Sequence, residues 1–199
     1  MISSVSKVFT PSFMNGLPQA RAALAFAYEL HEGQQRESDE APFILHPLEV
    51  AALLHNTGHR EPVVVAAILH DTIEDTEASA QEIDRRFGAE IARLVAAMTE
   101  DASIEDFGQR KAALRRQIAE AGPEATSVYA ADKVAKVREL RARLAAQPDL
   151  VRGQTQDRAR LEHYSESLIT LEQITPDHPL VRQLRFELEA LRALPPKGE

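Results

Sequence analysis

The amino-acid sequence predicts an all-α fold, a compact multi-helix bundle. Apolar residues make up 44% of the 199 residues, but aromatic residues only 5%, and tryptophan is absent. Such a core is built mostly from alanine and leucine, which favour helices. Apolar side chains recur at helical spacing between prolines and glycines that mark where segments begin and end. No segment outside one valine run resembles a strand.

The first helix is expected after a loosely held lead-in of residues 1–16. Pro18 suits the first turn of a helix, and apolar residues follow it at helical spacing. Gly33 is expected to end this helix. Residues 34–45 then read as a polar loop that becomes apolar just before His46.

The next two predicted helices carry the most apolar part of the chain. Pro47 is expected to start one helix, and Gly58 to close it. Pro62 opens the following segment, VVVAAILHDTIEDT. Its three valines suit a strand. However, the apolar run continues through Leu69 without a turn signal, which predicts one buried helix.

Helical patterns continue to the end of the chain. We expect a main domain over residues 17–175, and a C-terminal helix and tail over 176–199 that pack on the same domain. Breaks are expected at Gly88, at Gly122-Pro123, at Pro148 and Gly153, and at Pro176. The remaining helices are predicted over residues 79–87, 89–98, 111–121, 124–146, 155–174 and 178–193.

Charge and composition exclude several classes of protein. The formal net charge of −8 argues against a broad basic surface for duplex nucleic acid. The chain has no cysteine, which excludes disulfides and thiolate ligands or nucleophiles. No apolar run reaches the ~18 residues that a membrane span needs, and the N-terminus does not resemble a signal peptide. We therefore expect a cytoplasmic protein without a membrane partner.

The strongest chemical signal is a His-Asp pair that interrupts an apolar segment. His70 and Asp71 follow Leu69, and Glu74 and Asp75 come one helical turn later. Placing an imidazole beside three carboxylates is costly without compensation, and a divalent cation provides it. The competing interpretation is a helix that leaves the core at His70 and ends in a solvated acidic turn.

Two further residues favour the metal interpretation. His46 directly precedes Pro47, whose locked backbone dihedral restricts how that histidine is presented. Asp132 is a lone carboxylate in the apolar stretch VYAADKV, although an exposed position on an amphipathic helix is the commoner explanation for such a residue. With His70 and Asp71 they make a plausible site of two histidines and two aspartates.

The order of these residues resembles the H…HD…D signature of the HD superfamily of metal-dependent phosphohydrolases. The similarity is closest to the hydrolase domain of RelA/SpoT-type enzymes and to small stand-alone SpoT homologues, and it covers about residues 20–175. An ordered series of this length is far more specific than a bare His-Asp pair. The segments that carry it are HEGQQR (31–36), PFILHPLEVA (42–51), AILHDTIEDT (67–76), FG (87–88) and ADK (131–133).

The resemblance implies an HD-domain bundle and a hydrolase that removes the 3′-pyrophosphate from ppGpp and pppGpp with Mn²⁺. It assigns His46, His70, Asp71 and Asp132 as metal ligands, and Glu74 and Asp75 as the catalytic pair that orients or deprotonates the attacking water. Basic side chains can neutralise phosphate charge, and Tyr164 is a candidate substrate contact for which core packing is the commoner role. The expected basic substrate-binding residues are Arg36, Lys133, Lys136 and Arg138.

Three positions depart from the family pattern around the nucleotide. Glu37 replaces a basic residue, Lys136 replaces an asparagine, and Glu139 replaces a threonine. The alternatives are therefore an HD-type phosphatase for a different nucleotide or phosphorylated metabolite, a module that senses a nucleotide without hydrolysing it, and a helical scaffold with a vestigial motif. The intact metal ligands and the pair Glu74 and Asp75 favour an enzyme that acts on a phosphorylated nucleotide.

Overall fold

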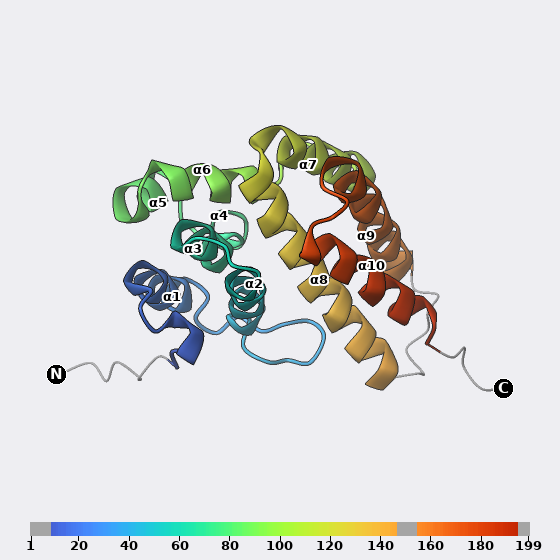
Figure 1. Cartoon of the computed structure of the whole chain (residues 1–199), viewed down its shortest axis with the longest axis horizontal. Coiled ribbons are helices and arrows are strands. Elements are labelled where there is room, and N and C mark those ends of the chain that lie inside the picture. The colour runs from blue at the N-terminus through green and yellow to red at the C-terminus, as the bar shows by residue number, and fades with distance from the viewer. Residues whose placement is uncertain (1–8, 147–154, 195–199) are drawn as a thin grey trace.

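A computed structural model describes residues 9–146 and 155–194, and these residues form an all-helical protein, as predicted (Figure 1). Within the described residues the only β-type pairing is an isolated bridge between Gln35 and Pro42. No helix there combines the length and apolar character needed to cross a lipid bilayer. The helices are α1 (Pro18–Leu30), α2 (Leu45–Asn56), α3 (Glu61–Leu69), α4 (Thr72–Asp75), α5 (Ala80–Phe87), α6 (Ala89–Met98), α7 (Phe107–Ala121), α8 (Pro123–Ala146), α9 (Thr155–Ile174) and α10 (Pro179–Arg192), with a 3-10 turn, η1, over Ser12–Met14.

Helix α3 occupies the centre of one half of the molecule. Every residue from Val63 to Leu69 is buried, because α1, α2, α6 and α8 all pack against this helix. A helix that is covered on all sides is apolar all round, which explains the run of three valines. Glu61 also ties α1 to α3, since its Oε1 accepts hydrogen bonds from the backbone N–H groups of Gln19 (2.7 Å) and Ala20 (3.1 Å).

Helix α8 joins the two halves of the molecule. It runs between α2 on one side and α9 and α10 on the other (Figure 1), and it also contacts α3, α6 and α7. All its residues from Ala125 to Ala135 are buried. Helix α10 packs on α8 and α9 through buried residues that include Leu180, Leu184 and Leu188. Asp132 therefore lies in the buried middle part of α8.

The lead-in and several helix boundaries differ from the sequence prediction. The lead-in over 1–16 is not loose throughout: η1 forms, and Met14 in it is fully buried. Helix α2 starts at Leu45 rather than Pro47, which places His46 inside the first turn. Helix α7 starts at Phe107, earlier than the predicted 111, because the Asp106 side chain caps it by accepting a hydrogen bond from the Gln109 N–H (2.8 Å).

The segment VVVAAILHDTIEDT forms two helices instead of the single predicted one. Helix α3 ends at Leu69, and α4 begins at Thr72, so the His-Asp pair forms the junction. The predicted helices over 89–98 and 155–174 have the expected bounds. The expected breaks at Pro148 and Gly153, and the tail from residue 195, lie outside the described residues.

Candidate metal centre and substrate pocket

The four expected metal ligands converge from three parts of the chain. His46 lies in the first turn of α2, His70 and Asp71 lie between α3 and α4, and Asp132 lies in the middle of α8. His46 Nε2 is 3.1 Å from Asp132 Oδ1 and 3.6 Å from Asp71 Oδ2. His70 Nε2 is 3.1 Å from Asp71 Oδ1 and 3.6 Å from Asp132 Oδ1. Two imidazole nitrogens and two carboxylates thus surround one point.

Side-chain hydrogen bonds to the backbone accompany the junction that presents the His-Asp pair. His70 Nδ1 lies 2.8 Å from the Ala67 carbonyl oxygen, and the Thr72 hydroxyl donates to the Leu69 carbonyl oxygen at 2.7 Å. Bonds of this kind offer the backbone an alternative to regular helix pairing. Because Nδ1–H of His70 has a carbonyl acceptor, the neutral form of this imidazole carries its lone pair on Nε2, which faces the other ligands.

The donor set fits a divalent cation. One ligand atom each from His46, His70 and Asp132 lie within 4.8 Å of one another, and all three residues are buried. Buried polar atoms are nearly always satisfied, yet His70 Nε2 is buried and makes no hydrogen bond of good geometry. Neutral imidazole and carboxylate are ligands that suit first-row divalent metals. Asp71 adds a fourth donor from the rim of the centre.

Charge at this centre also favours a cation. Burial acts to lower the pKa of His70, but the carboxylates of Asp71 and Asp132 outweigh burial and raise that pKa to about 10. Burial acts to raise the pKa of Asp132, yet nearby Lys133, Lys136 and the histidines hold it well below its usual range. The carboxylates therefore attract positive charge, and a divalent ion releases the imidazole proton when it binds.

Two lysines contact Asp132 at different oxygens. Lys133 Nζ donates to Oδ2 at 2.7 Å and also lies 4.6 Å from the centroid of the Tyr129 ring. Lys136 Nζ is 3.2 Å from Oδ1, the oxygen that faces His46 and His70. Partial burial acts to lower the pKa of Lys136, but Asp132 and Asp71 raise it well above its usual value. Both lysines are therefore cations beside the centre.

The expected acidic pair lies beside the centre on α4, and its two members have different surroundings. Asp75 lines a cavity that adjoins the centre. Desolvation is the largest cause that raises the pKa of Asp75, followed by the charges of Asp71 and Glu74, and the resulting pKa is about 6. Glu74 Oε2 instead accepts a hydrogen bond from the backbone N–H of Glu100 at 3.3 Å. Its pKa is raised by desolvation and by the carboxylates of Glu100 and Asp71. Of the pair, only Asp75 both faces the cavity and titrates near neutrality.

A cavity of about 720 Å³ opens over the centre, a size typical of small-molecule sites. His46 and Asp71 lie at its base, and it is lined by the loop between α1 and α2 together with α4, α7, α8 and α9. In Figure 1 that loop extends from α2 toward α8. Four of the five expected substrate-binding residues line the cavity: Arg36, Lys133, Lys136 and Tyr164.

The loop wall of this cavity contains two ion pairs. Arg36 forms a bidentate pair with Asp39 of the same loop. Glu37, one of the residues that departs from the family pattern, pairs with Arg160 of α9 at 2.6 Å. The base of the loop is held by Gln34, whose Nε2 donates to the Asp75 carbonyl oxygen at 3.1 Å. The loop is therefore tied to α4 and to α9 on opposite sides of the cavity.

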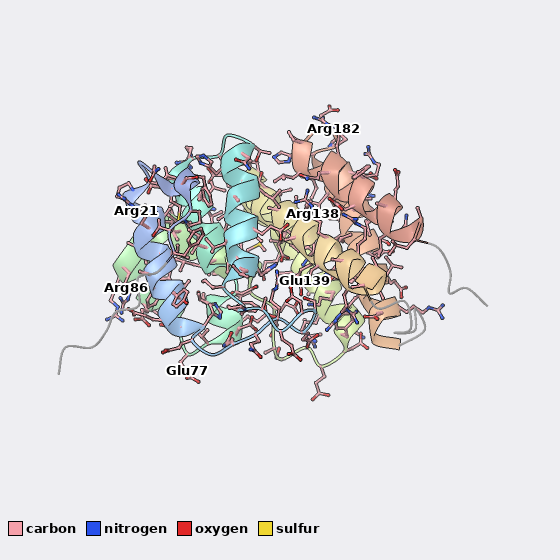
Figure 2. The ribbon with its side chains drawn as sticks, turned by 90° about the horizontal axis from the view of Figure 1, so that it is seen from below. Arg21, Glu77, Arg86, Arg138, Glu139 and Arg182 are labelled. Atoms are coloured by element: carbon pink, nitrogen blue, oxygen red, sulfur yellow. The ribbon has the colours of Figure 1, made fainter. Side chains whose placement is uncertain are left out.

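Arg138 is the expected substrate-binding residue that the structure does not bring into the cavity. Its Nε donates to Glu187 Oε1 of α10 at 2.6 Å, and its Nη1 lies 3.3 Å from Glu49 Oε1 of α2. Figure 2 shows Arg138 and Glu139 on different sides of α8. Glu139 lines the cavity and Arg138 does not. Arg138 thus belongs to the contact between α8 and its neighbouring helices.

Three cationic residues of the cavity wall were missed by sequence reasoning. Lys111 of α7, Arg143 of α8 and Arg160 of α9 line the cavity. Lys111 pairs with Glu100, and Arg143 lies 2.5 Å from Asp157. Nothing local distinguishes these residues from surface charges, since each becomes part of the site only when distant helices pack together. With Arg36, Lys133 and Lys136 they place six cationic side chains around the cavity, beside the five carboxylates of Glu37, Asp71, Asp75, Glu139 and Asp157.

Comparisons with known proteins agree with this geometry. The HD domain family matches residues 23–157. Human guanosine-3′,5′-bis(diphosphate) 3′-pyrophosphohydrolase MESH1 is 38% identical over 125 residues, which are 61% of this chain and 69% of that protein. A protein from Synechocystis sp. that is named a probable guanosine-3′,5′-bis(diphosphate) 3′-pyrophosphohydrolase is 47% identical over 77 residues. These residues are 39% of this chain but only 10% of that protein.

Two solved structures are similar to this chain in fold. A structure described as a metazoan ortholog of SpoT that hydrolyses ppGpp superposes with a TM-score of 0.74 at 26% identity, covering 94% of this chain and 99% of that one. A Listeria monocytogenes protein gives a TM-score of 0.62 at 30% identity, covering 73% and 97%. The chain belongs to the HD domain family of the MESH1 and SpoT type.

Proposed function

We propose that this protein is an Mn²⁺-dependent 3′-pyrophosphohydrolase that converts ppGpp to GDP and pyrophosphate. The single observation that carries the proposal is the convergence of His46, His70, Asp71 and Asp132 beneath a cavity that six lysine and arginine side chains line. The relatives that share this arrangement of helices include MESH1, whose name states that activity.

His46, His70, Asp71 and Asp132 are the residues proposed to hold the ion. A divalent ion supplies Lewis acidity, because it makes water easier to deprotonate and withdraws charge from a phosphoryl oxygen. Mn²⁺ accepts a mixed set of imidazole and carboxylate ligands. Lys133 keeps the second oxygen of Asp132 occupied, so that the first oxygen stays directed at the histidines.

Asp75 is the proposed general base. Its pKa of about 6 makes it mostly ionised at neutral pH while keeping it basic enough to accept a proton from the attacking water. Glu74, held by the Glu100 N–H, is proposed to orient that water. The water adds to the phosphorus nearest the ribose, the bond from that phosphorus to the 3′-oxygen breaks, and the 3′-oxygen gains a proton as GDP leaves.

Cationic side chains of the cavity wall are proposed to bind the phosphates. Lys133, Lys136, Lys111 and Arg160 surround the same cavity, and fixed cations in a partly enclosed site stabilise charge that develops on phosphate. Arg36 and the Tyr164 ring are proposed to contact the nucleoside. Arg36 is held by Asp39, and Tyr164 is largely buried with its pocket side exposed.

The test is pyrophosphate release from ppGpp by purified protein supplied with Mn²⁺. The wild-type protein should release pyrophosphate, and His70→Ala and Asp71→Ala should abolish release while retaining the helical circular-dichroism spectrum. Glu77→Gln is a matched control, because Glu77 is an exposed acid that does not line the cavity. Substantial turnover by the Asp71→Ala protein would refute the proposed ligand set.

A second candidate substrate is favoured by one observation. Glu37 and Glu139 line the cavity and place negative charge where a purely phosphate-binding wall would have none. This arrangement suits a phosphorylated nucleotide with a different distribution of phosphate. A screen of phosphorylated nucleotides for release of phosphate and of pyrophosphate separates the two: phosphate release without turnover of ppGpp favours the second candidate.

A further inference from the structure

The two carboxylate oxygens of Asp132 have different partners, and Lys136 contacts the oxygen that faces the histidines. Oδ2 accepts a hydrogen bond from Lys133 Nζ at 2.7 Å. Oδ1 faces His46 Nε2 at 3.1 Å and His70 Nε2 at 3.6 Å, and Lys136 Nζ lies 3.2 Å from this same oxygen. Oδ1 is therefore the oxygen that a metal ion would use, and Lys136 already contacts it.

A divalent ion and the Lys136 ammonium compete for this oxygen. With a metal–oxygen bond of about 2 Å, an ion on Oδ1 would be no more than about 5 Å from Nζ at its present position. Charges of +2 and +1 at that distance repel enough to weaken binding by about tenfold or more even in a medium like water. Lys136 either weakens binding of the ion or moves away when the ion binds.

Lys136 is able to move, whereas Lys133 is not. The Lys133 side chain is only 4% exposed and is enclosed between Asp132 and the Tyr129 ring. The Lys136 side chain is 35% exposed and lines the cavity in which the phosphates are proposed to bind. A flexible four-carbon stem lets such an ammonium group turn from one anion to another. The obvious second anion is a phosphate of the substrate.

We propose that Lys136 couples metal binding to substrate binding, because its ammonium group contacts Asp132 Oδ1 until an ion binds there and then pairs with a substrate phosphate. The inference rests on the proposed function for the nature of the substrate and of the metal site. It assigns Lys136 a role different from that of a simple phosphate contact: metal alone binds weakly, and metal together with the anion binds tightly.

Thermodynamic linkage makes this coupling measurable from either side. If the anion tightens metal binding by some factor, the metal must tighten anion binding by the same factor. Replacing Lys136 by a neutral residue removes the competitor for Oδ1 and also removes the partner of the phosphate. Metal should then bind more tightly on its own, and the metal should help the anion less.

The experiment measures Mn²⁺ affinity without turnover. Protein stripped with a chelator is titrated with Mn²⁺, and the free ion is followed by its electron paramagnetic resonance signal. The proteins are wild type, Lys136→Met, Lys136→Asn and Lys136→Arg. Arg93→Met is the matched control, since it removes one positive charge from an exposed position on α6 outside the cavity. The titrations are paired with calorimetric binding of guanosine 3′-phosphate, which carries a phosphate on the 3′-oxygen, with and without Mn²⁺.

Lys136→Met and Lys136→Asn should bind Mn²⁺ about tenfold or more tightly than wild type, from the repulsion they remove. Lys136→Arg and Arg93→Met should stay close to wild type. Mn²⁺ should strengthen binding of guanosine 3′-phosphate by a larger factor in wild type than in Lys136→Met. Neutral variants that bind Mn²⁺ no more tightly than wild type would overturn the role of Lys136 alone. Absence of saturable Mn²⁺ binding by wild type would overturn the metal centre and this inference together.

Discussion

Replacing Arg138 tests whether an arginine near the candidate metal centre contributes to stability or to substrate binding. In Arg138→Met the ion pairs with Glu187 (2.6 Å) and Glu49 (3.3 Å) are lost. The Arg138 side chain is 32% exposed, so solvent screens these pairs and each contributes about 0.5–1 kcal/mol. Buried Glu187 keeps Arg141 at 2.9 Å and is not left without a partner. The expected loss is about 1–2 kcal/mol, which lowers Tm by roughly 2–8 °C.

The assay pairs thermal unfolding with steady-state hydrolysis. Arg138→Met should unfold at lower temperature and keep the wild-type KM and kcat, because Arg138 lies on the side of α8 away from the cavity. Arg160→Met is the counterpart from the cavity wall. Loss of a charge-assisted hydrogen bond to phosphate should raise its KM about tenfold. An Arg138→Met protein with the KM increase of Arg160→Met and an unchanged Tm would refute the reasoning.

Three further outcomes follow from the site and the core. Activity should rise with pH through about 6 as Asp75 loses its proton, and Asp75→Asn should lose that rise; a pH profile of kcat is the check. Mn²⁺ at about 100 times its Kd should stabilise the folded protein by about 2.7 kcal/mol in thermal unfolding, and His46→Ala should remove most of this gain. Glu61→Ala should cost about 1–2 kcal/mol in urea unfolding because two N–H groups of α1 lose their acceptor.

The convergence of the four candidate metal ligands was predictable because these residues carry strong local signals. A His-Asp pair inside an apolar run, a histidine before a proline and an aspartate in a buried helix are each visible in the sequence. The cavity wall was not predictable in the same way. Glu37 and Arg160 are separated by 123 residues, and only the packing of α9 beside the α1–α2 loop brings them together.

The observed helix boundaries show where other interactions outweigh the spacing of apolar residues in the sequence. Apolar spacing predicted one helix through His70, but side-chain bonds from His70 and Thr72 to backbone carbonyl oxygens accompany the junction there. Similarly, the family resemblance suggested Arg138 as a substrate contact from its place after the last ligand. Adjacent residues on a helix point about 100° apart, and α10 supplies Glu187 as a buried partner on that side.

The arrangement of α8 places residues that affect thermal stability and residues that affect substrate choice on different sides of one helix. One side of this helix presents Lys133, Lys136 and Glu139 to the cavity, while Arg138 and Arg141 pair with α10 through Glu187. Substitutions at the α10 contact can therefore change heat tolerance without altering substrate choice, and substitutions on the cavity side can do the reverse. For an engineer, α8 offers two independent controls, one for durability and one for selectivity, in a single helix.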